Sequence, residues 1–213
     1  MGYLHRLKRW LIVTFTNWFV RLTKRTKAEE PKTLNVLNEP IEVFPFSTNS
    51  HILAQVTPIG TILWNQSRTE DFSETTKECI LRHELSHKKR NPILRGLVYG
   101  TTMWCAGGLI TVGLSIGLLL EGAPLPAVGV VFALGVLLIS VFIAAVRVDE
   151  TIAEYDAFRY LGEGKFIEAH QELSDVGETG FLTRIWVRLV YPTTDEIITI
   201  HRGIQRIQSK FTA

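Results

Sequence analysis

The sequence predicts a mainly α-helical membrane protein in which a transmembrane helical hairpin is inserted into a cytoplasmic α+β domain. Three features of the 213-residue chain support this fold class. Residues 96–120 and residues 122–146 contain no charged side chain, and each run exceeds the roughly 20 residues that cross a bilayer. A helical pattern with two histidines precedes these runs, and a small β-hairpin or sheet is predicted before that helix.

Residues 1–27 combine basic residues with an apolar, partly aromatic stripe at helical spacing. The stripe consists of Leu4, Leu7, Leu11, Trp18 and Leu22. The uncharged stretch of residues 10–20 is too short to cross a bilayer comfortably. The pattern therefore indicates a basic amphipathic helix on an anionic membrane surface. A helix packed on the domain and a short span are the alternatives.

The next part of the chain is predicted to be a linker followed by short strands. Residues 28–40 are the linker. Three segments have the β-branched and aromatic content of strands, residues 41–46, 51–57 and 61–65. Pro58, Ile59 and Gly60 separate the last two segments, which indicates a β-hairpin between them.

A helix is predicted after the polar residues 66–73. Either Asp71 or Ser73 can cap its first turn, because both side chains accept hydrogen bonds from backbone N–H groups. The helix is expected to continue to about Arg90 and to be interrupted at Pro92, whose ring is incompatible with the interior of a helix.

This helix carries the pattern H-E-x-x-H, formed by His83, Glu84 and His87. Positions four residues apart share a helix face, so both imidazoles can reach one metal ion. Glu84 follows the first histidine, where it can take a proton from a metal-activated water. A pattern this short arises by chance in roughly one chain in a hundred of this length, so the prediction depends on a third ligand.

The two uncharged runs are predicted to form a transmembrane hairpin, with Glu121 in the turn between them. A buried helical hairpin in a soluble protein is the alternative. Small residues on both runs permit close packing of the two helices: Gly113, Gly117, Gly129, Ala133 and Gly135. The alternative is the general use of small residues in membrane helices.

The charges that flank the hairpin predict its orientation. Basic residues precede the first run at Lys88, Lys89, Arg90 and Arg95, and Arg147 follows the second run. The connecting loop carries only an acidic residue. The positive-inside rule therefore places the histidine helix, the C-terminal part and both termini in the cytoplasm of a multi-pass protein of the cell membrane.

Residues 147–161 are predicted to be a helix that stops at Gly162 or Gly164. A helical tail follows, with a glycine-containing loop near residues 177–180 and a break at Pro192 before a last amphipathic helix. The last helix is expected over residues 194–208.

The predicted organisation of the chain is a surface helix (1–27), a linker (28–40), the first part of the functional domain (41–95), the hairpin (96–146) and the second part of the functional domain (147–213).

The hairpin returns the chain to the side on which His83 and His87 lie, so a third ligand is expected soon after it. A catalytic zinc takes three protein ligands and one water. Glu150 lies four residues beyond the second uncharged run, about 6 Å of helix rise. Asp149, Glu154 and Asp156 are on the same segment and compete with it, and these acids can also be solvated surface charges.

A resemblance to a known family indicates which of these acids binds the metal. The order of H-E-x-x-H, membrane hairpin and R-x-x-E-x-x-A-acid resembles the HtpX / CaaX prenyl protease family of membrane zinc metallopeptidases. The second motif is matched by Arg147, Glu150, Ala153, Glu154, Ala157, Leu161 and Gly162. The resemblance implies a zincin-like domain that binds Zn²⁺ through His83, His87 and Glu150. It places Glu154 where the family has an aspartate that supports a ligand histidine.

Two looser matches extend the resemblance over about residues 41–200. Asn49 lies in a segment similar to the family's N-A-F/Y-A sequence. Tyr191 and Pro192 resemble the family's H-P segment, with tyrosine in place of histidine. Tyr155 and Tyr191 are the candidate donors to the oxyanion that forms during peptide hydrolysis.

The predicted function is a membrane-embedded zinc endopeptidase that hydrolyses membrane or juxtamembrane polypeptides, with Glu84 as general base. Residues 51–57 or 61–65 are expected to bind the substrate as an added β-strand. The predicted partners are the lipid bilayer and polypeptide substrates, with no nucleic acid. The alternatives are a membrane sensor-transducer, for which the extracytoplasmic loop is short, and a non-proteolytic zinc-binding membrane protein.

The remaining histidines and the cysteine near the motif are predicted to have structural roles. His5, His51, His170 and His201 have no metal-ligand spacing with one another. Cys79 lies one turn before the motif, and a cysteine at such a position is more often a small core residue than a ligand.

Overall fold

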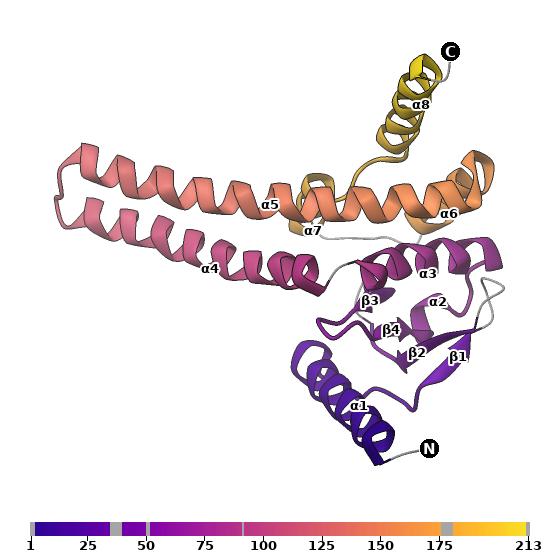
Figure 1. The fold of residues 1–213 in the computed structure, drawn as a ribbon. Coiled ribbons are helices and arrows are strands. Elements are labelled where there is room, and N and C mark those ends of the chain that lie inside the picture. Colours follow the sequence, from indigo (N-terminus) through magenta and orange to yellow (C-terminus); the bar gives the residue numbers. More distant parts are fainter. Residues whose placement is uncertain (1–2, 35–39, 50–51, 91, 176–180, 212–213) are drawn as a thin grey trace. The chain divides into compact units, whose positions relative to one another are not determined.

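The computed structural model describes residues 3–34, 40–49, 52–90, 92–175 and 181–211 (Figure 1). The described chain is mostly helical with a small mixed sheet, as the sequence predicts. It divides into two compact units. One comprises Met1–Arg90, Ile152–Phe181 and Thr193–Ala213, and the other comprises Asn91–Thr151 and Leu182–Pro192. Because the division falls inside helix α5 (Leu125–Leu161), both units share this helix.

The sheet of the first unit has the order β1-β2-β4-β3. Its strands are β1 (Lys32–Leu34), β2 (Ile41–Phe46), β3 (Ala54–Val56) and β4 (Ile62–Asn65). Strands β2 and β4 are parallel, and the two outer pairs are antiparallel. The predicted hairpin is confirmed between β3 and β4, and Gly60 in its turn has a φ of 83°, which favours glycine.

Strand β1 corrects the sequence prediction, because it lies inside the predicted linker. Its three residues have little strand character of their own, and two of them are exposed. They become a strand by pairing antiparallel with β2, where Thr33 is opposite Glu42. Part of the predicted linker therefore belongs to the sheet.

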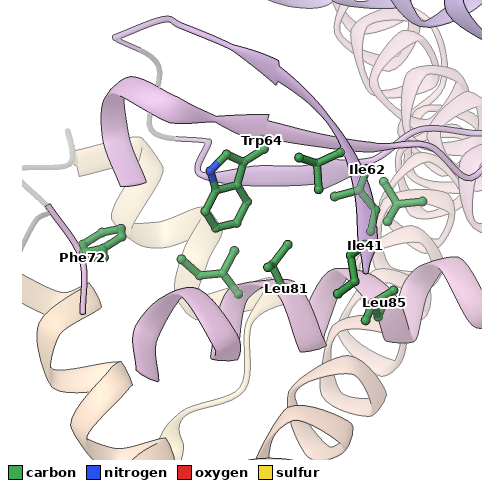
Figure 2. Packing of buried hydrophobic residues seen from close by; sticks show 9 residues of the cluster. Ile41, Ile62, Trp64, Phe72, Leu81 and Leu85 are labelled. Carbon is green, nitrogen blue, oxygen red and sulfur yellow. The ribbon is translucent and has the colours of Figure 1, made fainter. Parts of the chain in front are cut away.

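Helix α3 (Glu74–Lys89) covers one face of the sheet (Figure 2). Alternate residues of β2 and β4, such as Ile41 and Ile62, pack against Leu81 and Leu85 of the helix. Leu81 and Ile62 are completely buried, and each contributes about 1.5–3 kcal/mol through the apolar surface removed from water. This core holds the helix that carries the two motif histidines.

Helix α1 (Tyr3–Lys24) covers the opposite face of the sheet. Its Val20 is fully buried in a cluster with Phe44, Phe46 and Leu63, the residues of β2 and β4 that point away from α3. One face of α1 is therefore packed on the domain, which was the alternative to a helix on the membrane surface. The other face is exposed along Leu4, Leu11, Trp18 and Leu22.

Helix α3 begins and ends at local signals in the sequence. The Ser73 side chain accepts a hydrogen bond from the Thr76 N–H, so Ser73 rather than Asp71 is the N-cap. A short helix, α2 (Gln66–Thr69), precedes it. Glu172 of helix α6 (Glu163–Asp175) accepts hydrogen bonds from the Ser73 N–H and the hydroxyls of Ser73 and Thr76. An anion thus lies at the positive end of the helix dipole.

The second half of α5 packs with α3, α6 and helix α8 (Thr194–Phe211). The buried cluster contains Cys79, Ala157, Phe158, Phe166, Ala169 and Ile197. Helix α5 ends where predicted, and Gly162 has a φ of 81° immediately after it. These contacts fix the end of α5 relative to α3 within the first unit.

The second unit contains the predicted helical hairpin, formed by α4 (Pro92–Leu120) and the first part of α5. Two segments are long and apolar enough to cross a membrane, Met103–Leu120 and Leu125–Leu161, and in each only 11% of the apolar window is buried. Such exposure differs from the core helix of a soluble protein, whose apolar face is covered.

The close approach of α4 and α5 occurs at glycines other than the G-x-x-x-G pair. A Cβ on Gly108 would lie 2.8 Å from the Gly135 carbonyl oxygen, so the two backbones pack directly together. A Cβ on Gly113, Gly117 or Gly129 would have nothing within 4 Å. Close packing is therefore confirmed at Gly135, whereas Gly113, Gly117 and Gly129 fit the alternative of general small-residue usage in membrane helices.

Helix α7 (Phe181–Val190) belongs to the hairpin unit, although the sequence places it with the C-terminal part of the functional domain. The predicted break at Pro192 separates it from α8. The predicted glycine loop at residues 177–180 lies outside the described residues.

Candidate metal centre

Helix α3 brings His83 and His87 together on one face. Their Nε2 atoms are 3.0 Å apart, and their ring centroids are 4.7 Å apart. Two nitrogens bound to one tetrahedral zinc ion at 2.0–2.1 Å are separated by about 3.3 Å. The two imidazoles therefore need only a small adjustment to bind the same ion.

Glu154 of helix α5 supports His83 from the side opposite to Nε2. Its Oε1 lies 3.2 Å from Nδ1 of His83, although the angle departs from that of a straight hydrogen bond. Its Oε2 lies 3.2 Å from Nε2 of His170. A carboxylate beside Nδ1 favours the tautomer with its proton there, which leaves the Nε2 lone pair for a metal.

The environment of Glu154 keeps its carboxyl group ionised. Burial by itself would raise the pKa of Glu154, because an isolated charge is poorly solvated in the interior. The neighbouring imidazoles of His83 and His170 outweigh burial and hold this pKa well below its usual range. The negative charge beside His83 makes that histidine a more basic ligand.

Glu150 lies one turn before Glu154 on the uninterrupted helix α5. One ligand atom each from His83, His87 and Glu150 lie within 4.8 Å of one another. Residues four apart share a helix face, so one carboxylate can support His83 while the other faces the metal position. The flexible glutamate side chain can close the remaining distance by rotation about its χ angles.

The structure gives the competing acidic residues separate positions. Asp156 accepts a 2.6 Å hydrogen bond from the hydroxyl of Ser86, which joins α5 to α3. Glu154 contacts His83 through Nδ1, the nitrogen opposite Nε2. Asp149 is not part of the described three-residue group. Among the four acids, Glu150 is therefore the one that lies with both histidines in a group that could hold a metal ion.

Glu84 and Cys79, two further side chains of helix α3, are both buried. Glu84, the predicted general base, is buried, with 8% of its surface exposed. Cys79 is buried in the cluster between α3, α5 and α6, which confirms its predicted place in the core. Burial and the negative charge of Glu154 raise the pKa of the Cys79 thiol, so it stays protonated and is a poor metal ligand at neutral pH.

The other predicted site residues have the following surroundings. The Tyr155 hydroxyl is 3.3 Å from Nδ1 of His201 on α8, and its ring stacks on Phe158. Asn49 is exposed in a bend after β2. Tyr191 is 38% exposed at the end of α7. The roles of Tyr155, Tyr191 and Asn49 in catalysis stay predictions.

His170 is the site residue that sequence reasoning missed. It lies on α6, and its ring packs on Phe166 at a centroid distance of 4.3 Å. It contacts the site through Glu154, which is on another helix. No local spacing relates these residues, so the sequence carried no signal for this contact.

Comparison of the chain with protein-family models, with curated proteins and with solved structures finds no match. The function therefore has to be inferred from the site itself.

Proposed function

We propose that this protein is a membrane-embedded zinc endopeptidase that hydrolyses peptide bonds of membrane or juxtamembrane polypeptides. The observation that carries the proposal is the convergence of His83, His87 and Glu150 next to the buried Glu84. Two histidines and one glutamate are the protein ligands of a well-known class of catalytic zinc sites, which keep one position for water. The resemblance to the HtpX / CaaX prenyl protease family supports the same metal and reaction.

The side chains around the site have complementary roles in the proposed reaction. Zinc, when bound, polarises the scissile carbonyl and makes water a nucleophile near neutral pH. Glu84 takes a proton from this water at its carboxylate and later passes it to the leaving amine. Glu154 holds His83 at Nδ1, and His170 holds the other oxygen of Glu154. Helices held together by a buried core keep these groups oriented before the substrate arrives.

The sheet supports one of the two predicted substrate strands. Strand β4 lies between β2 and β3, so a substrate cannot pair with residues 62–65. Strand β3 is an outer strand of the sheet, and its Val56 packs in the same core as Leu85 of helix α3. We therefore place an extended substrate along β3, where its backbone would lie next to the helix that carries the motif.

The hairpin supports the membrane location. Both candidate spans expose most of their apolar surface, and a bilayer would cover it. The basic residues before the first span support a cytoplasmic site. The exposed apolar stripe of α1, with its basic neighbours, supports contact with the membrane surface. Substrates near the membrane follow from this location.

The proposal is tested by zinc content and proteolysis of a membrane model substrate, measured on the purified full chain and three variants. Glu84→Gln is expected to keep zinc and to lose cleavage by at least about 100-fold, because it removes the proton acceptor alone. Glu150→Ala is expected to lose zinc and cleavage together. Glu168→Gln, a matched change at an exposed position of α6, should leave both unchanged.

Two results would contradict the proposal in different ways. Full zinc content and activity in Glu150→Ala would exclude Glu150 as a ligand. A native chain that binds zinc and cleaves no membrane substrate would favour a non-proteolytic role, either as a sensor-transducer or as a structural zinc protein.

A further inference from the structure

Helix α7 exposes a nearly continuous apolar surface. Four consecutive or near-consecutive side chains are each 41–44% exposed: Ile185, Trp186, Val187 and Leu189. Over residues 184–190, where the side chains are described, every side chain is exposed except that of Val190. A ten-residue helix with such a surface is marginal in water by itself, so something must cover it.

Two contacts fix α7 on α5 within the hairpin unit. The Trp186 ring stacks on Phe142, with centroids 5.9 Å apart and ring planes at 25°. The Arg147 guanidinium donates hydrogen bonds of 3.1 Å to the carbonyls of Arg188 and Leu189. A cation at these last carbonyls satisfies acceptors that the helix leaves open and complements its dipole.

These contacts lie at the end of the uncharged run. Phe142 is the fifth residue from its end, and Arg147 is the first charged residue after it. The distance along α5 between them is about 7.5 Å of helix rise. If the run crosses the hydrocarbon core, this stretch lies at the level where hydrocarbon gives way to headgroups.

The composition of α7 is suited to the boundary between hydrocarbon and headgroups. Its ten residues contain Arg184 and Arg188 and no acidic side chain. Tryptophan is favoured at membrane interfaces, and arginines attract anionic headgroups. On α5, in the same unit, Leu137 and Val141 are also exposed, by 58% and 39%.

We propose that α7 is an interfacial helix that lies in the headgroup region of the bilayer at the end of the hairpin. The occupant of its exposed surface is lipid, with anionic headgroups at its arginines. This inference rests on the proposal that the hairpin spans the membrane. Glu150 follows Arg147 by one turn on α5, so α7 would fix the depth at which the proposed third ligand leaves the membrane. The site would then act on peptide bonds close to the membrane surface.

The test uses the full chain with Cys105→Ala, reconstituted in phosphatidylcholine–phosphatidylglycerol vesicles. Cys79 stays, because it is 2% exposed and its thiol is protonated. Single nitroxide labels are introduced by Val187→Cys on α7, Leu134→Cys on the exposed side of the span and Glu168→Cys on α6. Collision rates with oxygen, which partitions into lipid, and with a water-soluble nickel chelate report the surroundings of each label.

The label at position 187 is expected to have a several-fold higher oxygen-to-nickel ratio than the label at 168, at a depth of about 5–10 Å below the headgroup level. The label at 134 should lie deeper. A label at 187 that behaves like that at 168, with the label at 134 in lipid, overturns the interfacial helix and leaves the spanning hairpin intact. Protection of position 187 from both reagents would show a protein contact instead of lipid. A label at 134 exposed to nickel would overturn the spanning hairpin itself.

Discussion

The contact between Glu154 and His83 gives the sharpest test of the candidate metal centre. Glu154→Gln keeps the length of the side chain and removes its charge, whereas Glu154→Ala removes both contacts, to His83 and to His170. Loss of a carboxylate that supports a ligand histidine typically costs 10–100-fold in metal affinity, about 1.4–2.7 kcal/mol. We expect Gln near the lower limit, since its amide oxygen can still accept from one imidazole, and Ala near the upper limit.

Two further substitutions probe the geometry of this contact. Glu154→Asp shortens the side chain by one methylene, so it should reach only one of the two imidazoles and fall between Gln and Ala. His170→Ala leaves Glu154 beside His83 but removes its second partner, so we expect roughly a tenfold loss or less. Aspartate is the residue that the resembling family has at this position, which makes Glu154→Asp informative about how this chain differs.

The assay is competition for zinc between the purified protein and a chromogenic chelator, with helix content measured in parallel by circular dichroism. Glu168→Gln on the exposed side of α6 is the matched control and should bind zinc as the native chain does. If Glu154→Ala and Glu154→Gln both bound zinc within about twofold of the native affinity, the support of His83 by Glu154 would be refuted.

Two predictions concern stability. Gly135→Val should destabilise the hairpin by about 1–3 kcal/mol, because a Cβ there would lie 2.9 Å from the Gly108 carbonyl oxygen. Gly113→Val is the control, because a Cβ on Gly113 would have nothing within 4 Å. Thermal unfolding in detergent compares the two variants, and equal melting temperatures would contradict the close approach of the two helices. Glu172→Gln should destabilise the domain by less than about 1 kcal/mol at pH 7, since hydrogen bonds from Ser73 lower the pKa of this partly exposed carboxyl. Because the pKa of Glu172 is lowered in the folded state, its charge stabilises the fold above the unfolded pKa of about 4.3, and this stabilisation is lost as pH falls through the folded pKa. Denaturant unfolding should therefore give the native chain and Glu172→Gln the same free energy of unfolding in acid. A difference that persisted in acid would exclude the charge of Glu172 as its cause.

The secondary structure was predictable where it depends on local sequence. Residues 41–46 have an apolar, partly β-branched pattern and form β2 over the same bounds. Helix α5 ends at Leu161 because Gly162 adopts a positive φ. Strand β1 was not predictable, because three residues with a lysine and a threonine become a strand only by pairing with β2.

Helix packing was only partly predictable. The apolar stripe of α1 indicates an amphipathic helix, but its buried face is the one that contains Val20, opposite the stripe of Leu11 and Trp18. Likewise, glycine spacing marks residues that permit close contact, whereas the rotation of each helix decides that Gly108 meets Gly135. Rotation depends on all the side chains of both helices, so spacing alone does not specify it.

The sequence by itself determined the pairing of His83 with His87, since residues four apart on a helix share a face whatever surrounds them. It also determined the two uncharged runs, whose length is a property of composition. Residue spacing alone left Glu150 in competition with three other acids, and the tertiary structure shows that Glu150 lies near the two motif histidines while Glu154 contacts His83. Packing of α5 and α6 on α3 places Glu154 between His83 and His170, and Glu150, one turn earlier on α5, lies in the group with His83 and His87 that could hold a metal ion. Such contacts join residues far apart in the chain, and the buried core that holds the helices together brings these residues close to one another.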